Sequence, residues 1–208
     1  MKKHFQKTLI LLCMTLLCAN YVASAQTGKQ DSTYKRHFIG SSLFMLANLF
    51  PNSGSFYQLN YGYRLTPKDV VSVEVKTWRY KAPLGIPYGP SYEAEKENYP
   101  GSVRSIGLAL AYQRFLWRDF YTAVHAASFL QTYRNEKKEK IQDGYQLFCT
   151  FRLGYHLKLF KNKFFLEPSI AATYWPVNTN MPASFEVKEK KWNNYFLVEP
   201  GLHFGMKF

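Results

Sequence analysis

The last fourteen residues of the chain, 195–208, alternate between two kinds of side chain. One set is apolar throughout and comprises Phe196, Val198, Pro200, Leu202, Phe204, Met206 and Phe208. The other set is small or charged over most of its length. Successive side chains of a β-strand point to opposite faces, so this segment predicts a strand with one apolar and one polar face. Strands of soluble sandwiches are about 5–6 residues long, whereas a strand that crosses a bilayer needs about 9–11. The length of the alternation therefore favours a strand that spans a membrane.

The first 25 residues are typical of a secretory signal peptide. Three lysines lie within residues 1–7, and residues 8–17 form an apolar run that is too short to span a bilayer as a helix. Ala23 and Ala25 supply the small side chains of a cleavage site, so we expect the mature chain to begin at Gln26. An uncleaved anchor is the alternative. Residues 26–35 are mostly polar and predict a disordered leader.

Size, cysteine content and charge limit what the exported chain can be. Removal of residues 1–25 leaves 183 residues, enough for one domain. Only Cys149 of the three cysteines remains, which excludes an internal disulfide and a cysteine metal cluster. The formal net charge of +13 falls to +10 without the three lysines of the signal. We expect an exported basic protein to meet phosphate-bearing lipid rather than nucleic acid.

Eight long segments predict strands, and no segment after the signal is long and apolar enough for a transmembrane helix. The expected strands are residues 36–50, 56–66, 70–81, 103–117, 120–134, 145–160, 164–177 and 195–208. The faces of the first are weakly resolved, and those of the fifth poorly. Pro168 and Pro200 interrupt the last two strands, and because proline lacks a backbone donor we expect a bulge or an unpaired position at each.

The lengths of the links between these strands follow a rhythm. The links after the second, fourth and sixth strands have two or three residues, and those after the third, fifth and seventh have roughly 10–21. Only the link after the first strand departs from this pattern, because it is short. Short links on one side of a membrane and long loops on the other are typical of outer-membrane barrels. The pattern predicts an all-β fold, an antiparallel up-and-down transmembrane β-barrel of eight strands over residues 36–208.

The composition of the two faces predicts which one lines the interior. An eight-stranded barrel has an interior just wide enough for side chains. Gly, Ala and Ser gather on the polar faces and suit that space, whereas Leu, Phe and Tyr on the opposite faces suit a lipid-facing exterior. A buried charge needs a partner. We therefore expect a network of paired charges and histidines in the lumen, formed by Arg64, Glu74, Lys76, Arg152, His156, Lys158, Glu167, Glu199 and His203.

Aromatic residues gather near the ends of the expected strands and predict two girdles at the membrane surfaces. Those beside the short links are Trp117, Phe120, Phe160, Phe164, Phe165 and Phe208. Those beside the long loops are Trp78, Tyr80, Tyr133, Tyr145, Trp175 and Tyr195.

The final strand, which ends on Phe208 after apolar residues at every second position, resembles the C-terminal signature of bacterial outer-membrane β-barrels. Over residues 36–208 the chain resembles, in architecture rather than in matched sequence, the small eight-stranded barrels of the OmpA/OmpX shape. The resemblance implies a monomer in the outer membrane of a Gram-negative cell, surrounded by membrane lipid and lipopolysaccharide. It also implies that the barrel-assembly machinery recognises the last strand. It transfers no functional residue, because that shape has no shared catalytic motif.

Three functions are compatible with this architecture. The first is a structural or surface-interaction protein whose long loops face outward. The second is a lipid-modifying enzyme, which needs a nucleophile and a base within hydrogen-bond reach. His125 and Ser128 are three residues apart, so they lie on opposite faces of a strand, and we expect no catalytic, cofactor or metal site. The third is a soluble periplasmic barrel that binds an apolar ligand, which requires the apolar faces to point inward.

Two of the long loops are basic. Their lysines are Lys137, Lys138, Lys140, Lys188, Lys190 and Lys191. These residues form a candidate contact for lipopolysaccharide phosphates, and the alternative is ordinary solvated loop charge.

Overall fold

The structure is a computed structural model that describes residues 35–49, 55–86 and 95–208. The expected signal peptide, its cleavage after Ala25 and nearly all of the expected leader lie outside these residues. Among the described residues, no helix has the length and apolar character needed to cross a membrane.

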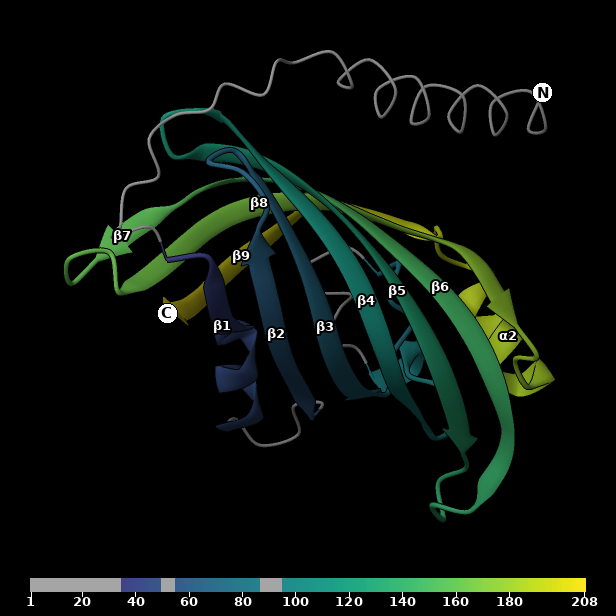
Figure 1. The fold of residues 1–208 in the computed structure, drawn as a ribbon. Coiled ribbons are helices and arrows are strands. Elements are labelled where there is room, and N and C mark those ends of the chain that lie inside the picture. The colour runs from purple at the N-terminus through teal and green to yellow at the C-terminus, as the bar shows by residue number, and fades with distance from the viewer. Residues whose placement is uncertain (1–34, 50–54, 87–94) are drawn as a thin grey trace, which may run out of the picture. The chain divides into compact units, whose positions relative to one another are not determined.

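The described chain forms one antiparallel β-sheet with three short helical segments (Figure 1). In order, the elements are β1 (His37–Ser42), η1 (Leu43–Leu49), β2 (Phe56–Arg64), β3 (Asp69–Tyr80), η2 (Glu95–Glu97), β4 (Ser102–Trp117), β5 (Phe120–Arg134), β6 (Lys140–Tyr155), β7 (Leu157–Leu159), β8 (Phe164–Thr179), α2 (Ala183–Glu189) and β9 (Tyr195–Lys207). Five of the strands reach 13 residues or more, well above the length usual in soluble sheets.

The pairings of the sheet run around a closed ring. Neighbours follow the order β6-β5-β4-β3-β2-β1-β9-β8-β7, and β6 pairs with β8 as well, which joins the two ends. The short β7 pairs only with β8, at its beginning. The ring is incomplete beside the short β1, which pairs with β2 only over Asn60–Tyr63 and with β9 only over His203–Lys207. Among the described residues, 56–59 of β2 and 195–202 of β9 therefore have no neighbouring strand on that side.

The alternation of side chains sorts them between the outside and the inside of the ring. On β4, Ile106, Leu108 and Leu110 are 56, 60 and 68% exposed, whereas Ser105 and Ala109 are 2% exposed. The apolar sets of β2 and β3 are likewise exposed, and residues of the polar sets such as Glu74 and Gln58 are buried. The outside of the ring is therefore apolar and the inside largely polar, as the residue types of the two faces predict.

β5 shows what its sequence left unresolved. Tyr121, Ala123 and Phe129 point inward and are buried, and Val124 and Leu130 point outward with 50 and 70% exposure. Small and aromatic side chains occupy the interior along this strand. Both faces of β5, the inner as well as the outer, are therefore largely apolar. That mixture hides the alternation in the sequence.

Strand one is shorter than expected. It ends at Ser42, and residues 43–49 form the 3-10 helix η1 rather than the second half of a strand. The physical reason lies in the sequence Leu-Phe-Met-Leu, an uninterrupted apolar run that gives a two-faced strand no polar side. The link from β1 to β2 is consequently long, so it no longer departs from the rhythm of the other links.

The sixth expected strand is also different. It begins earlier, at Lys140, so the link between β5 and β6 is only residues 135–139 instead of 135–144. It is interrupted at His156, whose backbone N–H donates to the carbonyl of Asp119 at 2.8 Å. The sheet therefore has nine strands, because β6 and β7 replace one expected strand.

An irregularity lies near one of the two expected prolines. Pro200 pairs in register with Ile170, and the register of β8 and β9 shifts between Ala171 and Thr173. Val198, in the same stretch of β9, has a φ of 63°. Both Leu197 and Val198 are more than 60% exposed as a result, so the alternation breaks there. Pro168 lies in a regular part of the ladder with β9. On its other side it is unpaired, because β6 pairs with β8 only as far as Ser169 and β7 only as far as Leu166, so the expected unpaired position is present there.

The links sort by length between the two ends of the ring. The links β2–β3, β4–β5 and β7–β8 have two to four residues and lie at the end that carries β7, whereas the other end carries η1, α2 and the long loops (Figure 1). These are called the short-link end and the long-link end below. At the short-link end, Trp117 and Phe160 are 69 and 79% exposed. At the long-link end, Tyr80, Tyr133 and Trp175 are at most 8% exposed, so they point inward and are not part of an outer girdle.

Candidate functional site

The interior of the ring holds a first group of charges around Glu74, on β3. The side chain of Lys76 on the same strand approaches the Glu74 carboxylate at 2.6 Å, and Nδ1 of His125 on β5 lies 3.0 Å from its other oxygen. Glu74 is 1% exposed. Residues two apart on one strand share a face, and β4 separates β3 from β5, so the curvature of the ring brings His125 across to Glu74.

A second group forms around Arg152, on β6. Its guanidinium lies 3.8 Å from the carboxylate of Glu199 on β9 and donates to Oγ of Ser169 on β8 at 2.9 Å. A Cβ atom at Gly201 would come within 2.0 Å of that guanidinium. The glycine on the inner face of β9 therefore makes the space that the arginine occupies.

A third group lies nearer the short-link end. Glu167 on β8 is 2.6 Å from Nδ1 of His156 and accepts a hydrogen bond from the side-chain amide of Gln113 at 3.0 Å. The His156 ring stacks on Phe165 with centroids 5.0 Å apart and meets the ring of Phe115 edge-on at 5.5 Å. The break between β6 and β7 places this imidazole in the interior.

A small cavity touches members of all three groups. Glu74, His125, Arg152, Glu167 and His203 belong to its lining. The buried Nε2 atoms of His125 and His156 and Nε of Arg152 have no hydrogen-bond partner among the described residues. The charged residues thus fill the interior as a network of pairs. Three of its nitrogen atoms have no hydrogen-bond partner among the described residues.

Two of the nine expected lumen residues lie at the short-link end of the interior. Lys158, on β7, shares the inner face with its ladder partner Phe165, but it is exposed at this end and pairs with Asp119 in the β4–β5 turn at 2.6 Å. Arg64 ends β2 at the same end, where its guanidinium lies 4.8 Å from the centre of the Phe115 ring and where it lines a small cavity with His156 and Glu167. The remaining residues, Glu74, Lys76, Arg152, His156, Glu167, Glu199 and His203, contact one another or line the cavity.

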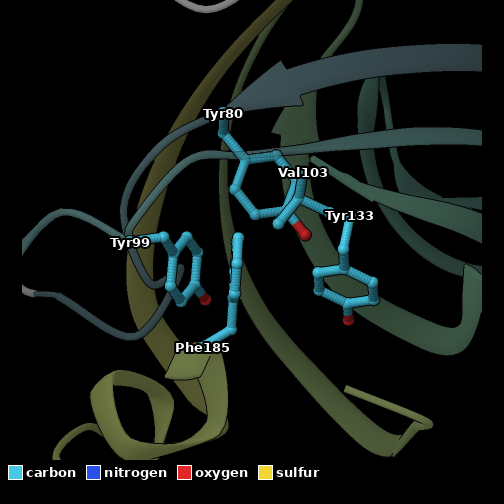
Figure 2. Packing of buried hydrophobic residues seen from close by; sticks show 5 residues of the cluster. All are labelled: Tyr80, Tyr99, Val103, Tyr133 and Phe185. Carbon is cyan, nitrogen blue, oxygen red and sulfur yellow. The ribbon is translucent and has the colours of Figure 1, made fainter. Parts of the chain in front are cut away.

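At the long-link end an aromatic cluster fills the mouth of the ring. Its buried residues are Tyr80, Tyr99, Val103, Tyr133 and Phe185, and Figure 2 shows the Phe185 side chain reaching from α2 to the tyrosines. The Phe185 ring stacks on Tyr99 at 4.8 Å and meets Tyr133 edge-on at 5.3 Å, and it is 0% exposed. Helix α2 is held over the interior by this contact.

Glu189, at the end of α2, adds a polar anchor to the cluster. It accepts hydrogen bonds from the hydroxyl of Tyr99 and from Nε1 of Trp175, the latter at 3.3 Å. Burial raises the pKa of the Glu189 carboxyl above its ordinary value, although these two donors oppose the rise. Burial, together with the nearby Glu189 carboxylate, also raises the pKa of the Tyr99 hydroxyl. Residue patterns gave no sign of this cluster, because Tyr99 and Phe185 lie in expected loops where no alternation marks a buried face.

Three of the six lysines expected in the basic loops have local partners. Lys140 lies 2.5 Å from Asp143, Lys190 lies 2.8 Å from Glu186, and Lys188 donates to the carbonyl of Lys96. Lys137, Lys138 and Lys191 are exposed. Lys140 begins β6 and Lys188 lies in α2, so only the other four belong to links between elements.

The histidine and serine that lie nearest each other in the sequence, His125 and Ser128, are not brought together. His125 points into the interior, whereas Ser128 is exposed and accompanies Tyr145 on the outside, as their spacing of three residues predicts. The two histidine–glutamate pairs of the interior are each accompanied by charged or amide side chains rather than by a nucleophile. No group of three or more His, Cys, Asp or Glu side chains placed to hold a metal ion occurs within the described residues.

Comparison with known proteins gave a weak likeness to a solved structure. No model of a protein family matches the sequence, and no curated protein matches it either. Among solved structures, the chain is similar to the crystal structure of Neisserial surface protein A (NspA). The sequences are 14% identical, the TM-score is 0.40, and the match covers 83% of this chain and 93% of that chain.

Proposed function

We propose that the chain is an integral outer-membrane β-barrel with eight strands around its ring, a filled lumen and a structural or surface-interaction role at its long-link end. The observation that carries the proposal is the inversion of polarity. Leu59, Leu108, Leu110 and Leu130 are 60–70% exposed, while Glu74 is 1% exposed. In water this arrangement would leave apolar surface uncovered and bury charge, and both are unfavourable. A hydrocarbon surround removes the first of these costs.

The height of the apolar surface supports the same proposal. On β3 and β4 the outward-facing rows between Asp69–Arg114 and Arg79–Arg104 are mostly apolar. The two rows are ten residues apart along each strand. A rise of about 3.3 Å per residue and a tilt of about 40° give a height of about 25 Å, which is that of the apolar band of outer-membrane barrels.

A filled interior argues against an open pore. The charge network and the aromatic cluster occupy the space that a channel would need, and an eight-stranded barrel is narrow to begin with. The reading as a soluble ligand-binding barrel needs apolar faces inside, and the burial pattern is the opposite. The long-link end, closed by α2, remains the surface that a partner outside the cell would meet.

The test is fractionation followed by gel electrophoresis. The full chain is expressed with its own first 25 residues in a Gram-negative host, and the outer-membrane fraction is run with and without boiling. A folded barrel is expected in that fraction with a mobility that changes on boiling. Recovery in the soluble periplasmic fraction, without a mobility change, would refute the proposal.

A further inference from the structure

Two arginines face each other directly on the outside of the ring. Arg79 on β3 and Arg104 on β4 are partners in the ladder, and they share the outward face with Val75 and Ile106. The backbone N–H of Arg79 donates to Ser55, on the side away from β4. The pair is therefore one of the non-hydrogen-bonded pairs of an antiparallel ladder, in which opposite side chains lie closest.

This pair carries two positive charges that have no partner among the described residues. Neither guanidinium has a hydrogen bond or an ion pair within the described part of the chain, and like charges directly opposite each other destabilise a sheet. Thr132, across from Arg104 on β5, bonds to the nearby Asp143, but that carboxylate is already occupied by Lys140. The arrangement needs an anion from elsewhere.

The other end of the same two strands provides a contrast. Arg114, on the same outward face of β4, lies 2.7 Å from the carboxylate of its ladder partner Asp69. Tyr112 donates a further hydrogen bond to that carboxylate at 2.6 Å. The cation at the short-link end is thus neutralised by Asp69, whereas the two at the long-link end have no carboxylate partner in the described ranges 35–49, 55–86 and 95–208.

We infer that Arg79 and Arg104 together bind the phosphate group of a membrane lipid at the long-link end. This inference rests on the proposed function, since it places the pair at the rim of the apolar band, next to the headgroups. A guanidinium donates two parallel hydrogen bonds to a phosphate and is more weakly hydrated than an ammonium group. One phosphate between two arginines removes their mutual repulsion and uses donors that have no other partner in the part of the chain that the structure describes. The site differs from the loop lysines, three of which have local partners.

The experiment compares three forms of the full chain, purified from the outer membrane in non-ionic detergent. They are the wild type, the double variant Arg79→Gln/Arg104→Gln, and the control Arg118→Gln/Lys161→Gln, which removes the same charge from exposed residues at the short-link end. Binding of lipid A with its phosphates, and of lipid A from which they have been removed, is measured by native mass spectrometry. Inorganic phosphate at millimolar concentration is the competitor.

We expect the double variant to bind phosphorylated lipid A at least tenfold more weakly than wild type, and the control to stay within twofold. The affinity of the wild type for lipid A should fall by the same factor when the lipid lacks phosphate. Inorganic phosphate should not displace the lipid. The variant Arg79→Lys/Arg104→Lys, which keeps the charge but not the paired donors, should lie between. Without lipid, the Gln variant should be at least as heat-resistant as wild type, because the repulsion is gone.

Several outcomes would overturn the inference. Equal lipid binding by wild type and the Gln variant removes the site, and displacement by inorganic phosphate makes it a general anion site rather than a lipid site. Every form is first checked for its presence in the outer membrane and for a mobility change on boiling. If wild type fails that check, the proposed function falls and the inference falls with it. If wild type passes and lipid binding does not depend on the arginines, only the inference falls.

Discussion

The side-chain amide of Asn48 forms two hydrogen bonds with the backbone of Phe56. Its Nδ2 donates to the carbonyl at 2.7 Å, and its Oδ1 accepts from the N–H at 2.8 Å. β1 pairs with β2 only from Asn60 to Tyr63, so the start of β2 lacks a neighbouring strand on that side. Asn48, on η1, supplies the donor and the acceptor that such a strand would offer.

Replacement of this residue should loosen the start of β2. Asn48→Ala leaves both backbone groups of Phe56 unpaired, and we expect the free energy of unfolding to fall by about 1–3 kcal/mol. Asn48→Asp keeps the acceptor for the N–H and loses the donor, so its effect should be smaller. Urea unfolding in detergent or lipid measures both. An Ala variant with the midpoint of wild type would show that η1 does not support β2.

The Glu74 pair in the interior should behave as a unit. Lys76→Met removes the cation 2.6 Å from a carboxylate that is 1% exposed, and breaking a buried pair in this way costs about 3–5 kcal/mol. The double variant Glu74→Gln/Lys76→Met also removes the carboxylate charge that the single variant leaves unpaired. It should therefore recover much of the lost free energy of unfolding. Unfolding free energies of the single and double variants give the coupling. Additive losses would mean that the two side chains do not interact.

A charge in the middle of the outer apolar face distinguishes lipid from water around the ring. Leu108 is 60% exposed and lies in the middle of the outward face of β4, so Leu108→Arg should destabilise the folded protein by about 2–4 kcal/mol in a bilayer. Val187→Arg, on α2 at a residue that is 64% exposed, is the control and should change stability little. Unfolding from lipid vesicles measures the difference. Equal and small effects would indicate that water surrounds β4.

The docking of α2 should depend on pH through Glu189. Burial raises the pKa of this carboxyl in the folded protein above its ordinary value of 4.5. The folded state therefore holds the proton more tightly than the unfolded state. The contribution of this group to stability is fully present below pH 4.5 and is lost as the pH rises through the raised pKa.

Glu189→Gln should remove this dependence while it keeps an acceptor for Tyr99 and Trp175. The comparison is between urea midpoints of the two forms at pH 4 and pH 8. Wild type is expected to lose stability relative to the Gln variant on going to the higher pH. A difference of the opposite sign would show that the hydrogen bonds to the carboxylate outweigh the burial.

Some features of the fold could be read from the residues, and others could not. β4 was predictable nearly to the residue, because large apolar side chains alternate with small or polar ones from Ser105 to Gln113. The bounds of β5, Phe120 and Arg134, were predicted correctly, but its inner and outer faces were not predictable. Tyr121 and Phe129 point inward beside small residues, which hides the alternation. The prediction of the first strand was wrong beyond Ser42, because an apolar run alone does not distinguish a strand from a short helix.

The candidate site divides in the same way. Residues of the polar parity, such as Glu74 and Glu167, were predictable as interior charges because a regular strand fixes the direction of every second side chain. The partners were not predictable, since His125 reaches Glu74 across an intervening strand. Lys158 keeps the expected inner face opposite Phe165, but it is exposed because it lies at the short-link end of the ring.

By itself the sequence determined the two faces of most strands, their lengths and the sorting of short and long links, because each of these follows from local alternation and turn composition. Only the tertiary structure decided how the ring closes and which charges meet inside it. It also decided that Arg79 and Arg104 lie side by side, and that Phe185 of α2 fills the mouth. The register between strands and the docking of a loop depend on contacts between residues far apart in the chain, and no local pattern records them.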